Sequence, residues 1–165
     1  MGLFSKLFGK SEKLNNNHIY APMTGKVVPI TEVPDPTFAE GMLGNGVAII
    51  PAEGKIYAPC DATVETMFST GHAVALSTAG GAELLIHVGL ETVGLNGAPF
   101  TIHVADGDQV KKGQLLFEAD LDAIQAAGLP IITPVVVCNS DDFPTFDTTV
   151  DRDVTNADVV IKLGK

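Results

Sequence analysis

The chain has 165 residues, and 20 Asp or Glu outnumber 10 Lys or Arg to give a formal net charge of −10. Nucleic acid is excluded as a partner because its phosphates would be repelled, whereas basic protein surfaces are favoured. No apolar run approaches the roughly 20 residues of a membrane span. The length fits one domain with a substantial core. Cys60 and Cys138 are too few for a disulfide framework, so we expect two small buried side chains and a cytoplasmic location.

Residues 1–17 are predicted to be an amphipathic tail and linker ahead of a single domain at residues 18–165. Apolar residues recur in this tail at helical spacing among positive charges, at Leu3, Phe4, Leu7 and Phe8 with Lys6, Lys10 and Lys13. This pattern is typical of a helix that lies on a membrane surface. We therefore expect weak peripheral contact of residues 1–14 with the inner membrane face. A disordered tail is the alternative, because an isolated helix of two or three turns is marginal in water.

From Ile19 onward, short apolar segments rich in Val, Ile and Thr alternate with turn residues, which predicts an all-β fold. One tetrapeptide occurs twice, at Ile19–Pro22 and Ile56–Pro59, and each copy is followed by a valine five residues after its proline. Two equivalent strand pairs are expected. The predicted architecture is an antiparallel β-sandwich or flattened barrel with internal pseudo-symmetry and little helix.

The best helical segment is Leu121–Ala127, with Asp120 as its N-cap and Gly128 as its stop. One or two turns are expected there.

Two histidines flank a glycine-containing turn between two apolar segments, His72–Thr78 and Ala82–Leu90. A two-residue loop would place His72 directly opposite His87 on one sheet face, with Cβ atoms roughly 4.5–5.5 Å apart. A three-residue loop would place the two side chains on opposite faces. The functional interpretation below depends on the first arrangement. His18 and His103 have no such partner and are predicted to be surface or packing residues.

A pair of imidazoles can carry a phosphoryl group. The chain has no phosphate-binding loop, dinucleotide fingerprint or serine nucleophile elbow. A neutral imidazole is a competent nucleophile near pH 7, so His87 is the predicted phosphate acceptor and His72 a hydrogen-bond donor to the transferred oxygens. Thr70 is predicted to hold His72 in one tautomer through its hydroxyl.

The same two histidines could supply half of a zinc site. Because structural and catalytic zinc sites need three or four protein ligands, a residue of a partner would have to complete it. No cofactor is required for the phosphate-carrying interpretation.

The segment Gly81–Val93 resembles the phosphorylation-site signature of the glucose-type enzyme IIA of the bacterial phosphoenolpyruvate:sugar phosphotransferase system. The resemblance extends from about Ile19 to Lys165 and includes further motifs at Ala21–Gly25, Val33–Asp35, Phe38–Glu40, Gly44–Gly46 and Thr133–Val136. The amphipathic start is similar to that of free-standing members.

This resemblance implies a β-sandwich in which His87 takes phosphate from HPr and passes it to the IIB domain of a sugar permease. It implies that His72 is the second histidine of the site and that Thr70 orients it. An apolar docking rim is expected at Phe38, Met42, Leu43, Phe68 and Val93, with Asp35 and Glu91 meeting cationic side chains of the partners. Regulation of other enzymes or permeases through the same surface is a further implication.

The alternative is a biotinyl- or lipoyl-like carrier or adaptor domain without phosphoryl transfer. The segments Gly107–Gly113 and Ala21–Gly25 are similar to the half-motifs of those domains, but the modifiable lysine in its usual hairpin is missing. Both segments could equally encode similar turns.

Overall fold

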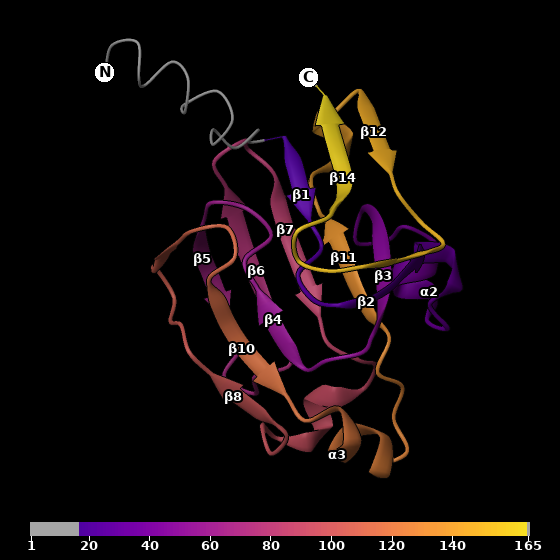
Figure 1. Ribbon diagram of the computed structural model, residues 1–165, viewed down its shortest axis with the longest axis vertical. Coiled ribbons are helices and arrows are strands. Elements are labelled where there is room, and N and C mark those ends of the chain that lie inside the picture. Colours follow the sequence, from indigo (N-terminus) through magenta and orange to yellow (C-terminus); the bar gives the residue numbers. More distant parts are fainter. Residues whose placement is uncertain (1–16, 165) are drawn as a thin grey trace.

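The computed structural model describes residues 17–164, which form a β-sandwich (Figure 1). The large layer is an eight-stranded sheet, ordered β13 (Arg152–Val154), β2 (Gly25–Pro29), β3 (Asn45–Pro51), β11 (Thr133–Val137), β7 (Glu83–His87), β6 (Ala73–Thr78), β5 (Ala62–Met67) and β9 (Gln109–Val110). Two three-stranded sheets complete it, namely β1 (His18–Tyr20), β14 (Val159–Gly164) and β12 (Thr145–Thr148), and β4 (Lys55–Tyr57), β10 (Leu115–Ala119) and β8 (Phe100–Ile102). Every strand pair in this region is antiparallel.

The core lies between the large sheet and the two small sheets. Alternate residues of the large sheet, such as Ile49 and Leu84, join Ile19 and Phe117 of the small sheets in one buried cluster. This is the period-two alternation expected of strands with one face on the core. The predicted all-β sandwich is confirmed, and the large sheet is open because its edge strands β13 and β9 do not pair with each other among the described residues.

A second, smaller cluster covers the outer face of the large sheet. It consists of Val28, Ile30, Val33, Phe38, Ala48, Leu90 and Val136. The connection between β2 and β3 contributes a 3₁₀ turn, η1 (Ile30–Glu32), and the short helix α2 (Pro36–Ala39), which Figure 1 shows beside β3. The candidate site lies on this outer face.

The predicted internal symmetry is confirmed in the pairing pattern. Tyr20 donates its backbone N–H to Pro59 O at 3.0 Å, and Tyr57 donates reciprocally to Pro22 O at 2.7 Å. The order of the large sheet is symmetric about its centre, where β11 pairs with β7. The strands therefore form two equivalent halves. We call β4–β10, which are central in the sequence, the central half, and β1–β3 with β11–β14, which flank them in the sequence, the flanking half.

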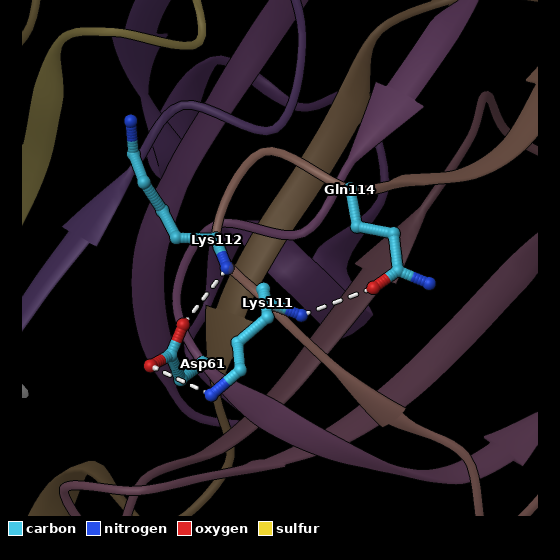
Figure 2. A network of polar contacts seen from close by, with 4 residues as sticks. All are labelled: Asp61, Lys111, Lys112 and Gln114. Carbon is cyan, nitrogen blue, oxygen red and sulfur yellow. Dashed lines mark hydrogen bonds and ion pairs between the residues drawn. The ribbon is translucent and has the colours of Figure 1, made fainter.

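Equivalent turns precede β10 and β14, and Figure 2 shows the first of them. Lys111 donates its backbone N–H to Gln114 Oε1 at 3.1 Å, as Thr155 does to Asp158 Oδ2 at 2.8 Å. In the first turn, Asp61 Oδ1 also accepts from the backbone N–H of Lys112 at 2.9 Å. The segment Gly107–Gly113 thus contains β9 between two turns, and both of its glycines have a φ of 88°.

Little helix is present. The helix α3 (Leu121–Ala126) begins at Asp120, whose Oδ1 accepts from Ala123 N at 3.1 Å, and is followed by Gly128 with a φ of 81°. The predicted cap and stop are confirmed. Two 3₁₀ turns, η2 (Thr92–Leu95) and η3 (Ser140–Asp142), complete the helical elements of residues 17–164. None of the helices described is long and apolar enough to cross a bilayer.

The prediction for the cysteines is half wrong. Cys60 is buried, and burial raises the pKa of its thiol to about 12, whereas Cys138 is exposed. Cys138 lies one residue beyond the end of β11, where the sheet no longer covers the side chain. The predicted tail at residues 1–16 lies outside the described residues.

Candidate functional site

The imidazoles of His72 and His87 lie against each other with ring centroids 5.0 Å apart. The predicted register is nevertheless wrong. Ala73, not His72, pairs with His87, because the hairpin loop has three residues, 79–81, and Gly81 takes a φ of 91°. Three-residue loops commonly combine a type I turn with a final residue in this conformation.

The rings meet because His72 is not part of the extended ladder. It precedes the first residue of β6 and follows Gly71, whose φ is 73°. Its carbonyl still accepts from Val88 N at 2.8 Å, which ties it to the end of β7. Strict alternation of faces applies only within an extended strand, so the opposite-face expectation for a three-residue loop does not hold at this position.

His87 is held through its Nδ1 atom, which lies 2.8 Å from Gly89 O. A carbonyl oxygen can only accept, so Nδ1 carries the proton and the Nε2 lone pair remains available. Burial lowers the pKa of His87, while the bond to Gly89 and the carboxylates of Asp35 and Glu91 oppose that shift. The neutral ring with a free Nε2 is therefore the form favoured at neutral pH.

His72 is 5% exposed, and its Nδ1 lies 2.7 Å from Thr70 Oγ1, as predicted from the sequence. Burial, and to a smaller degree the neighbouring His87, lowers the pKa of His72 to about 4. Phe68 packs edge-on against the ring at a centroid distance of 5.4 Å. His72 is thus a neutral imidazole in a fixed orientation.

Phe38 does not lie in an exposed rim. It is 5% exposed within the outer cluster, and its ring centroid is 5.3 Å from that of His87. Its place on α2 explains the difference, because α2 closes over the sheet and turns its apolar residue inward. Phe38 supports His87 and contributes to the surroundings that desolvate it.

The other expected rim residues are exposed. Met42 is 71%, Val93 50%, and Leu43 and Phe68 each 37% exposed. Asp35 is the N-cap of α2, where Oδ1 accepts from Thr37 N at 3.0 Å.

Glu91 is exposed directly before η2 and has a φ of 62°. It and Asp35 place negative charge close enough to His87 to affect its pKa.

Two contributors to the site were missed from the sequence. Leu85 shares the outer face with His87 and packs on the outer cluster, which its position two residues earlier in β7 could have indicated. Gly89 supplies the carbonyl for Nδ1 at a φ of 71°, and no local signal identifies that contact.

His18 and His103 are partly buried and exposed residues, respectively, as predicted. His103 is an exposed residue whose Nε2 lies 2.7 Å from Glu118 Oε2, and His18 is half-buried on β1. Within residues 17–164, no three His, Cys, Asp or Glu side chains gather as a metal site. Zinc at His72 and His87 would need ligands from another protein.

Residues 17–143 match the family described as phosphoenolpyruvate-dependent sugar phosphotransferase system, EIIA 1. The chain belongs to this family. It is 45% identical over 152 residues to the glucose-specific EIIA component of Halalkalibacterium halodurans, covering 88% of each chain. It is 50% identical over 125 residues to the beta-glucoside-specific EIIBCA component of Dickeya chrysanthemi, covering 76% of this chain and 20% of that protein.

A solved family structure, glucose permease IIA from Mycoplasma capricolum, has the same fold with a TM-score of 0.81. It is 32% identical, and the match covers 87% of this chain and 93% of the other. The family membership and fold support the phosphotransferase interpretation. The biotinyl- or lipoyl-like alternative is not supported, since the chain belongs to the EIIA family.

Proposed function

We propose that this phosphotransferase-system component accepts a phosphoryl group on Nε2 of His87 from HPr and passes it to the IIB domain of a sugar permease. The observation that carries the proposal is the Nδ1 bond to Gly89 O at 2.8 Å. It holds the ring in the tautomer whose other nitrogen is nucleophilic, and burial keeps the ring neutral at physiological pH.

The transfer is balanced without a proton leaving His87. The Nε2 lone pair forms the new N–P bond as the N–P bond of the donor's phosphohistidine breaks, and the donor ring regains its electron pair. Nδ1–H stays bonded to Gly89 O and stabilises the positive charge that the ring gains in the transition state. Transfer to IIB is the same step in reverse, with a nucleophile of the IIB domain attacking phosphorus.

His72 stabilises the phosphoryl oxygens during transfer to IIB. When Thr70 donates its hydroxyl to Nδ1 at 2.7 Å, Nε2 carries the proton and becomes a donor. The ring is neutral, because its pKa is lowered to about 4, so it contributes a fixed dipole rather than a charge. Because a dipole binds the phosphoryl oxygens less strongly than a charge would, the phosphoryl group can leave again, as a carrier requires.

The surroundings suit docking of basic, partly apolar partners. Met42, Leu43, Phe68 and Val93 are exposed, and Asp35 and Glu91 add negative charge. Rim charges of this kind steer association and fix orientation more than they add affinity. Regulated enzymes or permeases would dock on the same surface, and a carboxylate from such a partner could complete zinc coordination at the two histidines.

The sugar is set by the permease. Relatives of similar identity are named for glucose and for beta-glucosides, which agrees with specificity lying outside the IIA domain. The Dickeya relative also carries its A component in one chain with B and C components, as its name states. We assign this chain to the glucose-type class of IIA components.

Incubation of the purified protein with enzyme I, HPr and phosphoenolpyruvate tests the proposal. One acid-labile, base-stable phosphate per chain is expected by intact mass. His87→Gln should abolish acceptance, whereas His103→Gln, which alters an exposed histidine paired with Glu118, should leave it unchanged. Acceptance by a folded His87→Gln variant would refute the assignment.

Residues 1–14 are proposed to assist transfer to a permease in anionic lipid. Apolar residues between positions 3 and 8 could bury area in the interface, and each lysine near the surface contributes about 1 kcal/mol. Circular dichroism of this peptide should show helix only with anionic vesicles. A peptide that stays unstructured there, with truncation leaving permease-coupled transfer unaltered, would make the segment a linker.

A further inference from the structure

A fully buried hydroxyl lies beneath the candidate site. Thr92 is 0% exposed at the start of η2, and its Oγ1 donates to Val88 O at 2.6 Å. This bond joins the residue directly after His87 to the first residue of η2. It closes the turn that contains Gly89.

Gly89 is confined from two sides within that turn. A Cβ built on it would lie 2.7 Å from Thr92 Cγ2 and 2.7 Å from Pro130 O. The same Pro130 carbonyl accepts from Leu90 N at 3.2 Å, which fixes the far side of the turn. The peptide after Gly89 therefore has little freedom to rotate, and its oxygen remains directed at His87 Nδ1.

We propose that Thr92 is a positioning residue for His87: its hydroxyl closes the turn, and the closed turn holds the Gly89 carbonyl that selects the Nδ1–H tautomer. The inference deepens the proposed function, on which it rests for the identity of Nε2 as the nucleophile. Thr92 touches neither the reacting atoms nor the phosphoryl group. It acts through Gly89.

The alternative is that the hydroxyl merely satisfies a buried carbonyl, as buried polar groups generally must. The two roles differ in what they do to the His87 ring. Loss of a purely structural bond lowers stability but leaves the tautomer unchanged. Loss of a positioning bond releases the Gly89 carbonyl, so that the ring samples the Nε2–H tautomer, which is not nucleophilic at Nε2.

Thr92→Val removes the hydroxyl and retains the volume, while Thr92→Ser retains the hydroxyl. Thr78→Val is the matched control, because Thr78 is also buried in the β6–β7 hairpin and its Oγ1 accepts from Ala82 N at 2.9 Å, but at the hairpin end away from His87. Nitrogen-15 NMR of the His87 ring in the unphosphorylated full chain at neutral pH reports the tautomer. The rate of phosphate acceptance from HPr is measured in parallel.

We expect the Nε2–H fraction to rise in Thr92→Val and acceptance to slow about fivefold, the factor expected for one lost neutral hydrogen bond. Thr92→Ser should restore both, and Thr78→Val should change neither. An unchanged His87 tautomer in folded Thr92→Val, or an equal change in Thr78→Val, would overturn the proposal. If Thr92→Val does not fold, Thr92→Ala removes the same hydroxyl with a smaller side chain. The tautomer is read without phosphate, so failure of the wild-type protein to accept phosphate would refute the proposed function separately.

Discussion

The two halves of the sandwich have equivalent strands but different chemistry. In the central half His87 pairs with Ala73, and in the flanking half Val136 pairs with Gly46 at the corresponding place. His87 thus corresponds to a buried valine of the outer cluster, and His72 corresponds to Asn45. The fold supplies two equivalent strand ends, and the residues at each end decide which one can carry a phosphoryl group.

The connections between the strands differ as well. Residues 30–44 join β2 to β3 in the flanking half, while residues 68–72 join β5 to β6 in the central half. The longer connection contains η1 and α2 and reaches across the outer face, where it supplies Phe38 and Asp35 to His87. The site is therefore built on one half and enclosed by a connection from the other.

The largest expected effect comes from removing that enclosure. Phe38→Ala should cost about 3–5 kcal/mol of stability, because a buried aromatic ring is lost from the outer cluster. Leu43→Ala, on the same connection but more exposed, should cost about 0.5 kcal/mol or less. Urea unfolding of both variants measures this contrast. Similar stabilities would mean that α2 does not enclose the site in solution.

Replacing the second histidine should separate the two transfer steps. His72→Gln is expected to accept phosphate from HPr but to deliver it to IIB about 10²–10³-fold more slowly, because one transition-state donor is lost while the nucleophile stays. Single-turnover rates for each step measure the effect, with Asn45→Gln at the equivalent position of the flanking half as the control. Complete loss of both steps in folded His72→Gln would contradict the role of stabiliser.

Sequence patterns predicted the strands, the internal repeat and the helix at residues 121–126, because alternation, caps and turn residues are local signals. They also paired the correct histidines, although by an incorrect register. The loop length depended on Gly81 taking a positive φ, and the meeting of the rings depended on His72 leaving the ladder after Gly71. Neither could be predicted from spacing.

The burial of Phe38 shows a different limit. An apolar residue on a short amphipathic segment fits an exposed rim as well as a cover over the sheet. Only the packing of α2 on the outer face distinguishes the two.

The lowered pKa of His72 predicts a dependence of stability on pH. Its folded pKa of about 4 lies below the ordinary value of 6.5, so between these values the unfolded chain binds a proton that the folded chain does not. This contribution is fully present above pH 6.5 and declines as the pH falls toward 4. The loss should be on the order of 1–3 kcal/mol.

Urea unfolding of wild type and His72→Gln at several pH values isolates this contribution, since carboxylate effects are common to both proteins. The variant should lose less stability than the wild type between pH 6.5 and 4. Parallel curves would mean that His72 is not desolvated in the folded protein.

The smallest expected effects are on docking. Met42→Ser and Leu43→Ser alter exposed apolar side chains, so each should slow phosphate transfer between partners by about fivefold or less and lower the stability by about 0.5 kcal/mol or less. Ile50→Ser, which alters an exposed apolar side chain near the end of β3 and outside the expected rim, is the matched control and should not affect transfer. Equal effects at all three positions would argue against a localised docking rim.

Nuclear magnetic resonance of the phosphorylated, nitrogen-15-labelled protein tests the central claim most directly. One phosphorus should couple to Nε2 of His87, with the proton still on Nδ1 and the bond to Gly89 O retained. Phosphate on His72, or on Nδ1 of His87, would contradict the account.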